Sequence, residues 1–155
     1  MKNLKLILAF ILLTAFTGNF FAINQPGQRI AARKCLRRTA VVMIHAHNKL
    51  KESKVYTGNM TKAVRHQRYA RLLFRQGKFV RAIHQSRRAR QLAFLVIQAN
   101  KGSVNKDWEL TQEEKPANSP SDDELEKELP SDAENLTDEK IASSDLKDID
   151  LDDKD

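Results

Sequence analysis

Acidic residues are almost absent from the middle of this chain. Residues 23–106 contain 20 Lys and Arg but a single acid, Glu52, a charge of +19. Residues 107–155 reverse the balance, because 19 Asp and Glu against 5 Lys give −14. Together with +2 from residues 1–22, these charges make up the net +7. Folded surfaces normally mix both signs, so this separation indicates an interaction surface followed by an acidic tail.

Residues that carry chemistry are also scarce. Cys35 is the only cysteine, so the chain has no internal disulfide. We interpret Cys35 as a small buried helix residue, and the alternative is an intermolecular disulfide. His45 and His47 are two positions apart, point to nearly opposite sides of a helix and cannot share a metal. Without motifs for haem, phosphate or nucleophile chemistry, and with almost no carboxylate near the basic residues, the sequence predicts no cofactor, no metal site and no enzyme.

The last residues alternate acids in a way that partly matches a calcium loop. Asp148, Asp150 and Asp152 have the spacing of its first ligands, but the turn glycine and the distal glutamate are missing. We therefore expect loose calcium binding at most and interpret this stretch as a solvated acidic tail.

The first residues have the pattern of an export signal. Lys2 and Lys5 precede an apolar run over residues 6–15, which polar residues end. We predict cleavage after Ala22, so that residues 1–22 are a signal peptide and the protein is exported to the periplasm or cell surface of a bacterium. Phe20 stands where a small residue is preferred, and the alternative is an uncleaved inner-membrane anchor.

The hydrophobic periodicity predicts three helices. They are expected over residues 29–52, 61–76 and 78–100. Asn59 or Thr61 is a candidate cap for the second helix, and Gly77 has the position of a glycine that ends it. The third helix is apolar on several sides near its end, which indicates burial between two neighbours or an exposed apolar patch.

After these helices the composition changes to Pro, Ser, Asp and Glu. Low hydrophobicity with high charge cannot offset the entropy cost of ordering a chain. We therefore predict an all-α fold, with a basic three-helix domain at residues 23–108 and a disordered acidic tail at residues 109–155. Short helical turns are expected near residues 122–129 and 138–146. A domain of this size is expected to be marginally stable or to need a partner.

The stretch "YARLLFRQGKFVRAIHQSRRA" places small residues and a glycine at the spacing of a helical hairpin. The positions that carry the pattern are Ala70, Leu73, Gly77, Phe79, Ala82 and Ala89. Residues 62–95 thereby resemble a single tetratricopeptide repeat, although His66, Ser86 and Phe94 depart from the motif. The resemblance implies a protein-interaction module with Gln67, Arg71 and Arg75 on its groove face. The alternative is a plain helical hairpin, since one repeat cannot bury its own face.

The basic surface is the strongest functional signal. Arginine forks bind carboxylate, phosphate or sulfate at two points. The candidate binding residues are Gln67, Arg71, Arg75, Arg87, Arg88 and Arg90. We predict binding to an acidic protein segment or an anionic envelope polymer, with the chain's own acidic tail shielding the surface at high effective concentration.

Other partners follow from the same charge pattern. The export signal and the lack of a base-reading motif argue against nucleic acid. One alternative is membrane association, through the anchor or through basic helices on anionic lipid. Another is a self-associating structural protein, with Cys35 or the apolar residues 92–97 at the interface.

Overall fold

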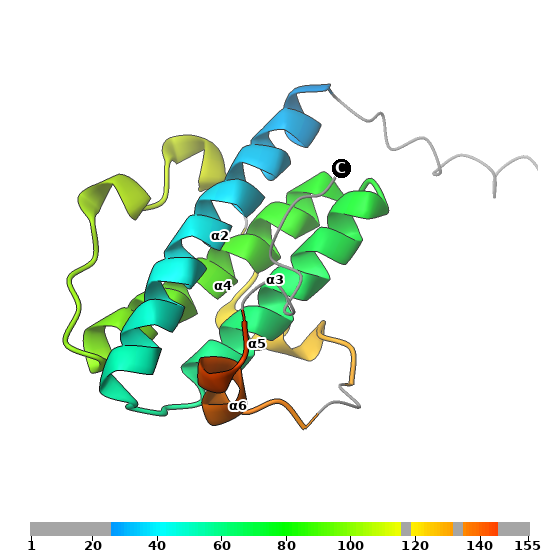
Figure 1. The fold of residues 1–155 in the computed structure, drawn as a ribbon. Helices are drawn as coiled ribbons and strands as arrows, with labels where there is room; N and C mark the ends of the chain where they lie inside the picture. Colours follow the sequence, from blue (N-terminus) through cyan, green and yellow to red (C-terminus); the bar gives the residue numbers. More distant parts are fainter. Residues whose placement is uncertain (1–25, 116–118, 132–134, 146–155) are drawn as a thin grey trace, which may run out of the picture.

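The computed structural model describes residues 26–115, 119–131 and 135–145, and all regular structure within them is helical (Figure 1). The elements are α2 (Pro26–Ser53), α3 (Asn59–Arg75), α4 (Phe79–Ala99), η1 (Lys106–Trp108), η2 (Gln112–Glu114), α5 (Asp122–Lys127) and α6 (Asp138–Ser143). The all-α prediction is confirmed. The predicted signal peptide lies outside the described residues. None of the helices in the described ranges is long and apolar enough to cross a membrane.

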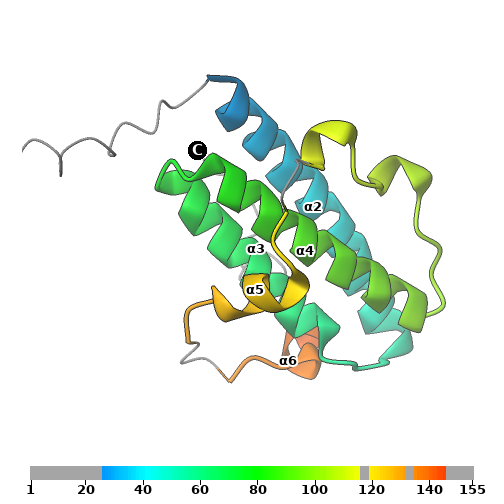
Figure 2. The ribbon, with the colours of Figure 1, turned by 180° about the vertical axis from the view of Figure 1, so that it is seen from behind.

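Helix α2 buries the face that its periodicity predicts. Pro26 stands at its first position, where the missing amide hydrogen costs no helical hydrogen bond. The stripe that faces the other helices is wholly buried at Ala32, Leu36, Thr39, Met43, Ala46 and Leu50. Burial of this stripe places α2 lengthwise against α3 and α4, beside which it lies in both views (Figures 1 and 2).

Helices α3 and α4 form an antiparallel pair joined by a tight turn. Gly77 adopts a positive φ of 74°, which glycine tolerates without the steric cost of a side chain. Its amide donates to the Phe74 carbonyl oxygen at 3.0 Å, and the Lys78 amide donates to the Leu73 carbonyl oxygen at 2.9 Å. These two bonds satisfy carbonyls that the end of α3 leaves open. The helix end predicted at Gly77 is thus correct.

The start of α3 differs from the prediction that Asn59 or Thr61 caps it. Gly58 occupies the cap position with φ 81°, and no side chain at that position accepts a hydrogen bond from the helix. Asp138, from the distant α6, binds the amides of Gly58 and Thr61 instead. A cap supplied from so far along the chain leaves no local sequence signal.

Two apolar clusters make up the core. The first contains Val42, Met43, Ala46, Leu50, Met60, Ala63, Val64, Ala89, Leu92, Ala93, Val96, Ile97, Ile141 and Ala142. The second contains Ala32, Cys35, Leu36, Ala70, Leu73, Phe74, Phe79, Ala82 and Ile83. The end of α4 lies in the first cluster, which agrees with burial between neighbours, although Leu95 remains exposed.

The chain after α4 returns over the three long helices. It runs back along α2 and α4 through η1 and η2, places α5 against α4, and places α6 against the end of α2 and the start of α3 (Figures 1 and 2). Leu125, Ile141 and Ala142 are buried there. The prediction of a disordered tail from residue 109 is therefore wrong for residues 109–115, 119–131 and 135–145.

The reason for this difference lies in the partner surface. Judged by its composition alone, the acidic segment has too little apolar surface to become ordered. Here its few apolar side chains enter a core that α2, α3 and α4 already form, and its carboxylates meet arginines on the same helices. Ordering therefore depends on the basic helices rather than on the acidic segment itself.

Candidate interaction surface

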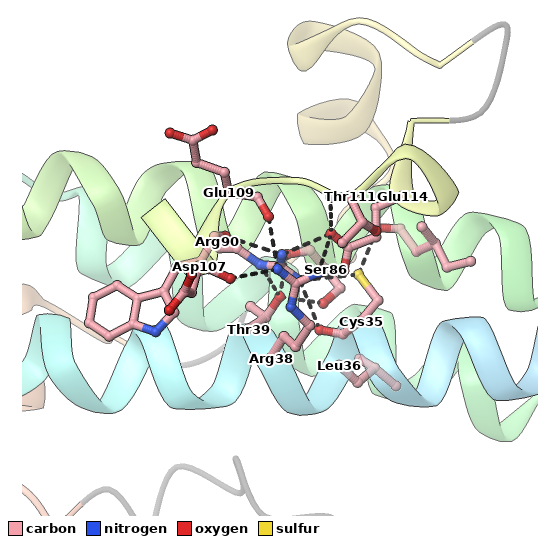
Figure 3. A network of polar contacts seen from close by, with 12 residues as sticks. Cys35, Leu36, Arg38, Thr39, Ser86, Arg90, Asp107, Glu109, Thr111 and Glu114 are labelled. Carbon is pink, nitrogen blue, oxygen red and sulfur yellow. Dashed lines mark hydrogen bonds and ion pairs between the residues drawn. The ribbon is translucent and has the colours of Figure 1, made fainter. Parts of the chain in front are cut away.

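A buried ion pair joins α4 to η2. The Arg90 guanidinium meets the Glu114 carboxylate at two points, Nη1 to Oε2 and Nη2 to Oε1, each at 2.9 Å (Figure 3). The Arg90 side chain is fully buried, and that of Glu114 is 6 % exposed. Two-point pairing of this kind is strong and directional. It fixes the acidic segment to the helices at one defined position.

The other nitrogen of Arg90 and its neighbours complete the site. Nε donates to Thr39 Oγ1 at 3.1 Å, and Nη2 also donates to the Cys35 carbonyl oxygen at 3.1 Å. Both acceptors belong to α2, as Figure 3 shows. Because every guanidinium nitrogen has an acceptor, burial of this charge leaves no nitrogen without a partner.

Glu114 is held by a second arginine and by its own turn. Arg38 Nη1 lies 3.2 Å from Glu114 Oε2, and the Thr111 amide donates to the same oxygen at 3.0 Å. Burial alone would raise the pKa of Glu114, but hydrogen bonds from Arg90 and Thr111 and the charges of Arg90 and Arg38 hold that pKa below its ordinary value. Glu114 is therefore a carboxylate that links α2 to α4.

Cys35 lies beside this ion pair. Its Sγ is 3.5 Å from Arg90 Nη2 and 3.9 Å from the Ile83 carbonyl oxygen, and the side chain is buried. Burial raises the pKa of the thiol to about 11, against the lowering effect of Arg90. The interpretation as a small buried helix residue agrees with this position. A disulfide to another chain would require the site to open.

A chain of uncharged polar groups continues from the ion pair into the α3–α4 contact. Ser86 Oγ lies 2.9 Å from Thr39 Oγ1 and 3.0 Å from Gln67 Oε1. Gln67 Nε2 donates to the Leu36 carbonyl oxygen at 3.0 Å. Ser86, Thr39 and Gln67 are all buried. These contacts give the buried Ser86 hydrogen-bond partners on both α2 and α3.

Helix α5 covers a second buried polar pair. His66 Nδ1 lies 2.6 Å from Gln85 Oε1, and both side chains are buried between α3 and α4. Gln85 Nε2 donates to the Leu125 carbonyl oxygen at 3.1 Å and to Glu128 Oε2 at 3.0 Å. His66 Nε2 lies 3.1 Å from Glu126 Oε2. The outward polar atoms of the pair thus meet acceptors from α5 and its C-terminal end.

Two arginines of α4 flank the same region. Arg88 Nη1 lies 2.7 Å from Asp122 Oδ2, and Arg81 Nη2 lies 3.3 Å from Glu128 Oε2. The Asp122 and Arg81 side chains are largely exposed. Exposed pairs of this kind contribute little to stability, but they set the orientation of an acidic helix on a basic one.

The end of the bundle where α2 begins and α3 ends is basic. Residues 26–37 and 70–80 contain no Asp or Glu. Arg33 lies over the Phe74 ring, with its Cζ 5.8 Å from the ring centroid, so the two segments meet in space. The exposed cations there are Arg29, Lys34, Arg37, Arg75 and Lys78. We call this set the basic end.

The six candidate binding residues do not form one surface. Gln67 and Arg90 are fully buried or nearly so, and Arg71 is buried too. Arg87 is half-buried and donates to Ser119 Oγ at 3.0 Å, whereas Arg88 pairs with Asp122. Arg75 alone of the six is exposed. For Gln67 and Arg90 the prediction of a partner contact conflicts with their burial, because neither is accessible in this conformation.

Several residues that build the site were not singled out from the sequence. They are Arg38, Gln85, Glu114, Glu126, Glu128 and Asp138. A signal did exist for two helix starts in the acidic segment, since Thr111 and Ser121 each precede a glutamate by three positions. The pairing of Glu114 with Arg90 had no such signal in the sequence.

The histidines serve packing and hydrogen bonding. The His45 ring packs at a tilt of 57° against Trp108 with ring centroids 4.9 Å apart, and His47 Nε2 lies 2.9 Å from the Ile141 carbonyl oxygen. His84 is buried, and burial together with the charge of Arg87 lowers its pKa. In the part of the chain that the structure describes, no three His, Cys, Asp or Glu residues are placed to hold a metal ion. The candidate calcium residues Asp148, Asp150 and Asp152 lie outside that part.

The comparisons with known proteins give no relative. No family model matches the chain, and neither a curated protein nor a solved structure is significantly similar to it.

Proposed function

We propose that this chain is an exported, non-catalytic binding protein that holds an acidic protein segment or an anionic envelope polymer on its basic helices. One observation carries the proposal. Carboxylates from the acidic segment, Glu114, Asp122 and Glu128, form ion pairs with Arg90, Arg88 and Arg81 of α4. A helical surface that already accepts an acidic chain at three arginines has the chemistry to accept another.

The basic end offers the room for such a partner. Its exposed cations stand on α2, on the last turn of α3 and in the turn after it, and residues 26–37 and 70–80 contain no acid. A cluster of one sign concentrates anions and speeds their association, and this effect weakens as salt is added. In this proposal the chain's acidic residues regulate access by competing at high effective concentration.

The helical hairpin of α3 and α4 supports an interaction role. The tetratricopeptide-like pattern of residues 62–95 is part of the proposal, because such hairpins present helix faces to protein segments. The export signal predicted at residues 1–22 makes an envelope polymer or an exported protein the fitting partner.

A second candidate function rests on the outward face of α2. Ile30, Val41 and Ile44 are 57 %, 55 % and 43 % exposed, and Lys34 and Arg37 lie between them at helical spacing. A stripe of apolar and basic residues is typical of helices that lie on anionic lipid. Membrane association through α2 is therefore the alternative.

Binding measurements with charge variants test the main proposal. The variant Arg29→Gln/Lys34→Gln removes two charges from the basic end, and Lys51→Gln/Lys62→Gln removes two exposed charges from the opposite end of the bundle. We expect the first variant to bind polyglutamate about tenfold more weakly than wild type at low salt, and the second to change little. Equal losses in both variants would show that net charge alone attracts the polymer, and the proposal would fail.

Vesicles separate the second candidate from the first. Wild type and Val41→Ser/Ile44→Ser are compared on vesicles of phosphatidylglycerol and of phosphatidylcholine. Membrane association predicts that the apolar variant loses binding to the anionic vesicles, since apolar burial adds to charge attraction. Unchanged vesicle binding would argue against α2 as a membrane helix.

A further inference from the structure

The surface under α5 is built for a carboxylate-bearing helix. His66 and Gln85 are both fully buried at the contact of α3 with α4, where apolar side chains would hold two helices together at less cost. The hydrogen-bond partners of their outward polar atoms come from α5 and the residues that follow it. Glu126 contacts His66, and Glu128 contacts Gln85. Both buried side chains therefore take hydrogen-bond partners from the occupant of this surface.

The hydrogen bonds also specify what the occupant must offer. Gln85 Nε2 faces two acceptors, so Gln85 Oε1 faces His66 Nδ1, which must donate to it. His66 Nε2 then faces a carboxylate oxygen of Glu126, an acceptor when ionised. A hydrogen bond between these two atoms requires a proton on one of them. A carboxyl group satisfies this position whether the proton is carried by His66 or by the carboxyl, whereas an apolar side chain would leave His66 Nε2 without a partner.

The resident helix has the features of an exchangeable occupant. Helix α5 has six residues and one buried apolar side chain, Leu125, which is 6 % exposed. Its ion pairs with Arg81 and Arg88 are partly exposed, and exposed pairs contribute little. A short helix with a single apolar anchor is held weakly compared with the long helices below it.

We propose that the surface formed by His66, Arg81, Gln85 and Arg88, here named the α5 site, is a receptor for an acidic amphipathic helix of another protein, and that α5 is its resident competitor. The partner helix carries a leucine at the place of Leu125, with acids three positions before it and one and three positions after it. This inference rests on the proposed function and specifies the acidic protein segment as the partner and the α5 site as its place.

A peptide exchange experiment on the full chain tests the proposal. The probe is a fluorescent peptide with the sequence of residues 119–131. The full-length variant Asp122→Asn/Glu126→Gln/Glu128→Gln weakens the resident helix, and Glu109→Gln/Glu139→Gln/Asp145→Asn removes the same charge at exposed acids outside α5. Fluorescence anisotropy then reports peptide binding by each chain.

The expected result is a competition. The variant with the weakened α5 should bind the peptide about tenfold more tightly than wild type, because an intramolecular occupant acts at high effective concentration. The matched charge variant should bind like wild type. Adding Gln85→Glu to the weakened variant places an acid against acids and should abolish binding, and a peptide with L125A should bind more weakly. Circular dichroism confirms that each variant retains its helices.

Several outcomes would overturn the inference. One is equal peptide affinity of wild type and the weakened variant with both chains folded. Another is peptide binding that Gln85→Glu leaves intact, which would show general charge attraction. A wild-type dimer that the peptide dissociates would assign the α5 site to a second copy of this chain. If peptide exchange fails while the basic-end variant still binds polyglutamate more weakly than its control, this inference falls and the proposed function stands. If neither experiment gives its expected result, the inference and the proposed function both fall.

Discussion

Asp138 Oδ1 accepts a hydrogen bond from the amide of Thr61 and another from its hydroxyl group, each at 2.8 Å. Its second oxygen accepts from the Thr57 and Gly58 amides at 3.0 and 2.7 Å. The start of α3 is thus closed by a carboxylate from α6. A negative charge near the N-terminus of a helix also interacts favourably with the positive end of the helix dipole. The acidic segment therefore contributes to the stability of the basic helices.

Replacing Asp138 should destabilise the protein. We expect Asp138→Ala to lower the free energy of unfolding by about 1–3 kcal/mol, because a cap and several charge-assisted hydrogen bonds are lost. Urea unfolding followed by circular dichroism measures this change. Glu139→Ala, at an exposed position of the same helix turn, is the matched control and should change little. Equal effects of the two substitutions would contradict the capping role of Asp138.

The ion pair of Arg90 with Glu114 predicts a larger effect. Glu114→Ala leaves the guanidinium of Arg90 buried without its carboxylate. We expect this substitution to lower the free energy of unfolding by about 3–5 kcal/mol. Arg90→Met/Glu114→Ala should be less destabilised than the sum of its single variants, since no charge is then left unpaired. A double-mutant cycle in urea measures the coupling. Strict additivity would contradict a direct pairing.

The same carboxylate predicts a dependence on pH. Folding lowers the pKa of Glu114 from its ordinary 4.5, so the native state binds this proton more weakly than the unfolded state does. The stabilisation is complete above the unfolded pKa and is lost as the pH falls through the lower folded pKa. We expect the stability difference between wild type and Glu114→Gln to shrink between about pH 7 and about pH 3. Urea unfolding across this range tests it, and a constant difference would refute it.

Cys35 should be protected in the folded protein. Its side chain is buried and its pKa is raised to about 11, so very little of the reactive thiolate is present and accessible. We expect an aromatic disulfide reagent to react with Cys35 rapidly only after denaturation, whereas a cysteine placed by Ser103→Cys at an exposed position should react at once. Absorbance kinetics measure both rates. Fast native labelling of Cys35, or a dimer that reductant dissociates, would contradict its burial.

Much of the helical framework follows from local patterns. The apolar period of α2 and the glycine after α3 place two helices and a turn within a few residues of their observed bounds, since helix faces and helix ends are governed by neighbouring residues. The cap of α3 could not be found this way. Gly58 and Thr61 carry no indication that Asp138, 80 and 77 residues away, completes them.

The candidate site was predictable in its charge and not in its geometry. The arginines of α4 are alike in sequence, yet Arg90 is buried, Arg88 is half-buried and Arg81 is exposed. The three arginines differ in burial because the Glu114 carboxylate reaches Arg90 at a buried position where α2 also supplies hydrogen-bond acceptors. Periodicity ranks positions by side-chain polarity and therefore places every arginine outside.

By itself, the sequence determined the all-helical class, the turn at Gly77 and the separation of positive from negative charge, because each depends on residues close together in the chain. The tertiary structure alone decided that residues 109–115, 119–131 and 135–145 pack on the helices, and which arginines they reach. The order of the acidic segment depends on contacts with distant residues. An acidic segment has too little apolar surface to fold alone. Packed on the basic helices, it has its charges paired and its few apolar side chains buried in their core.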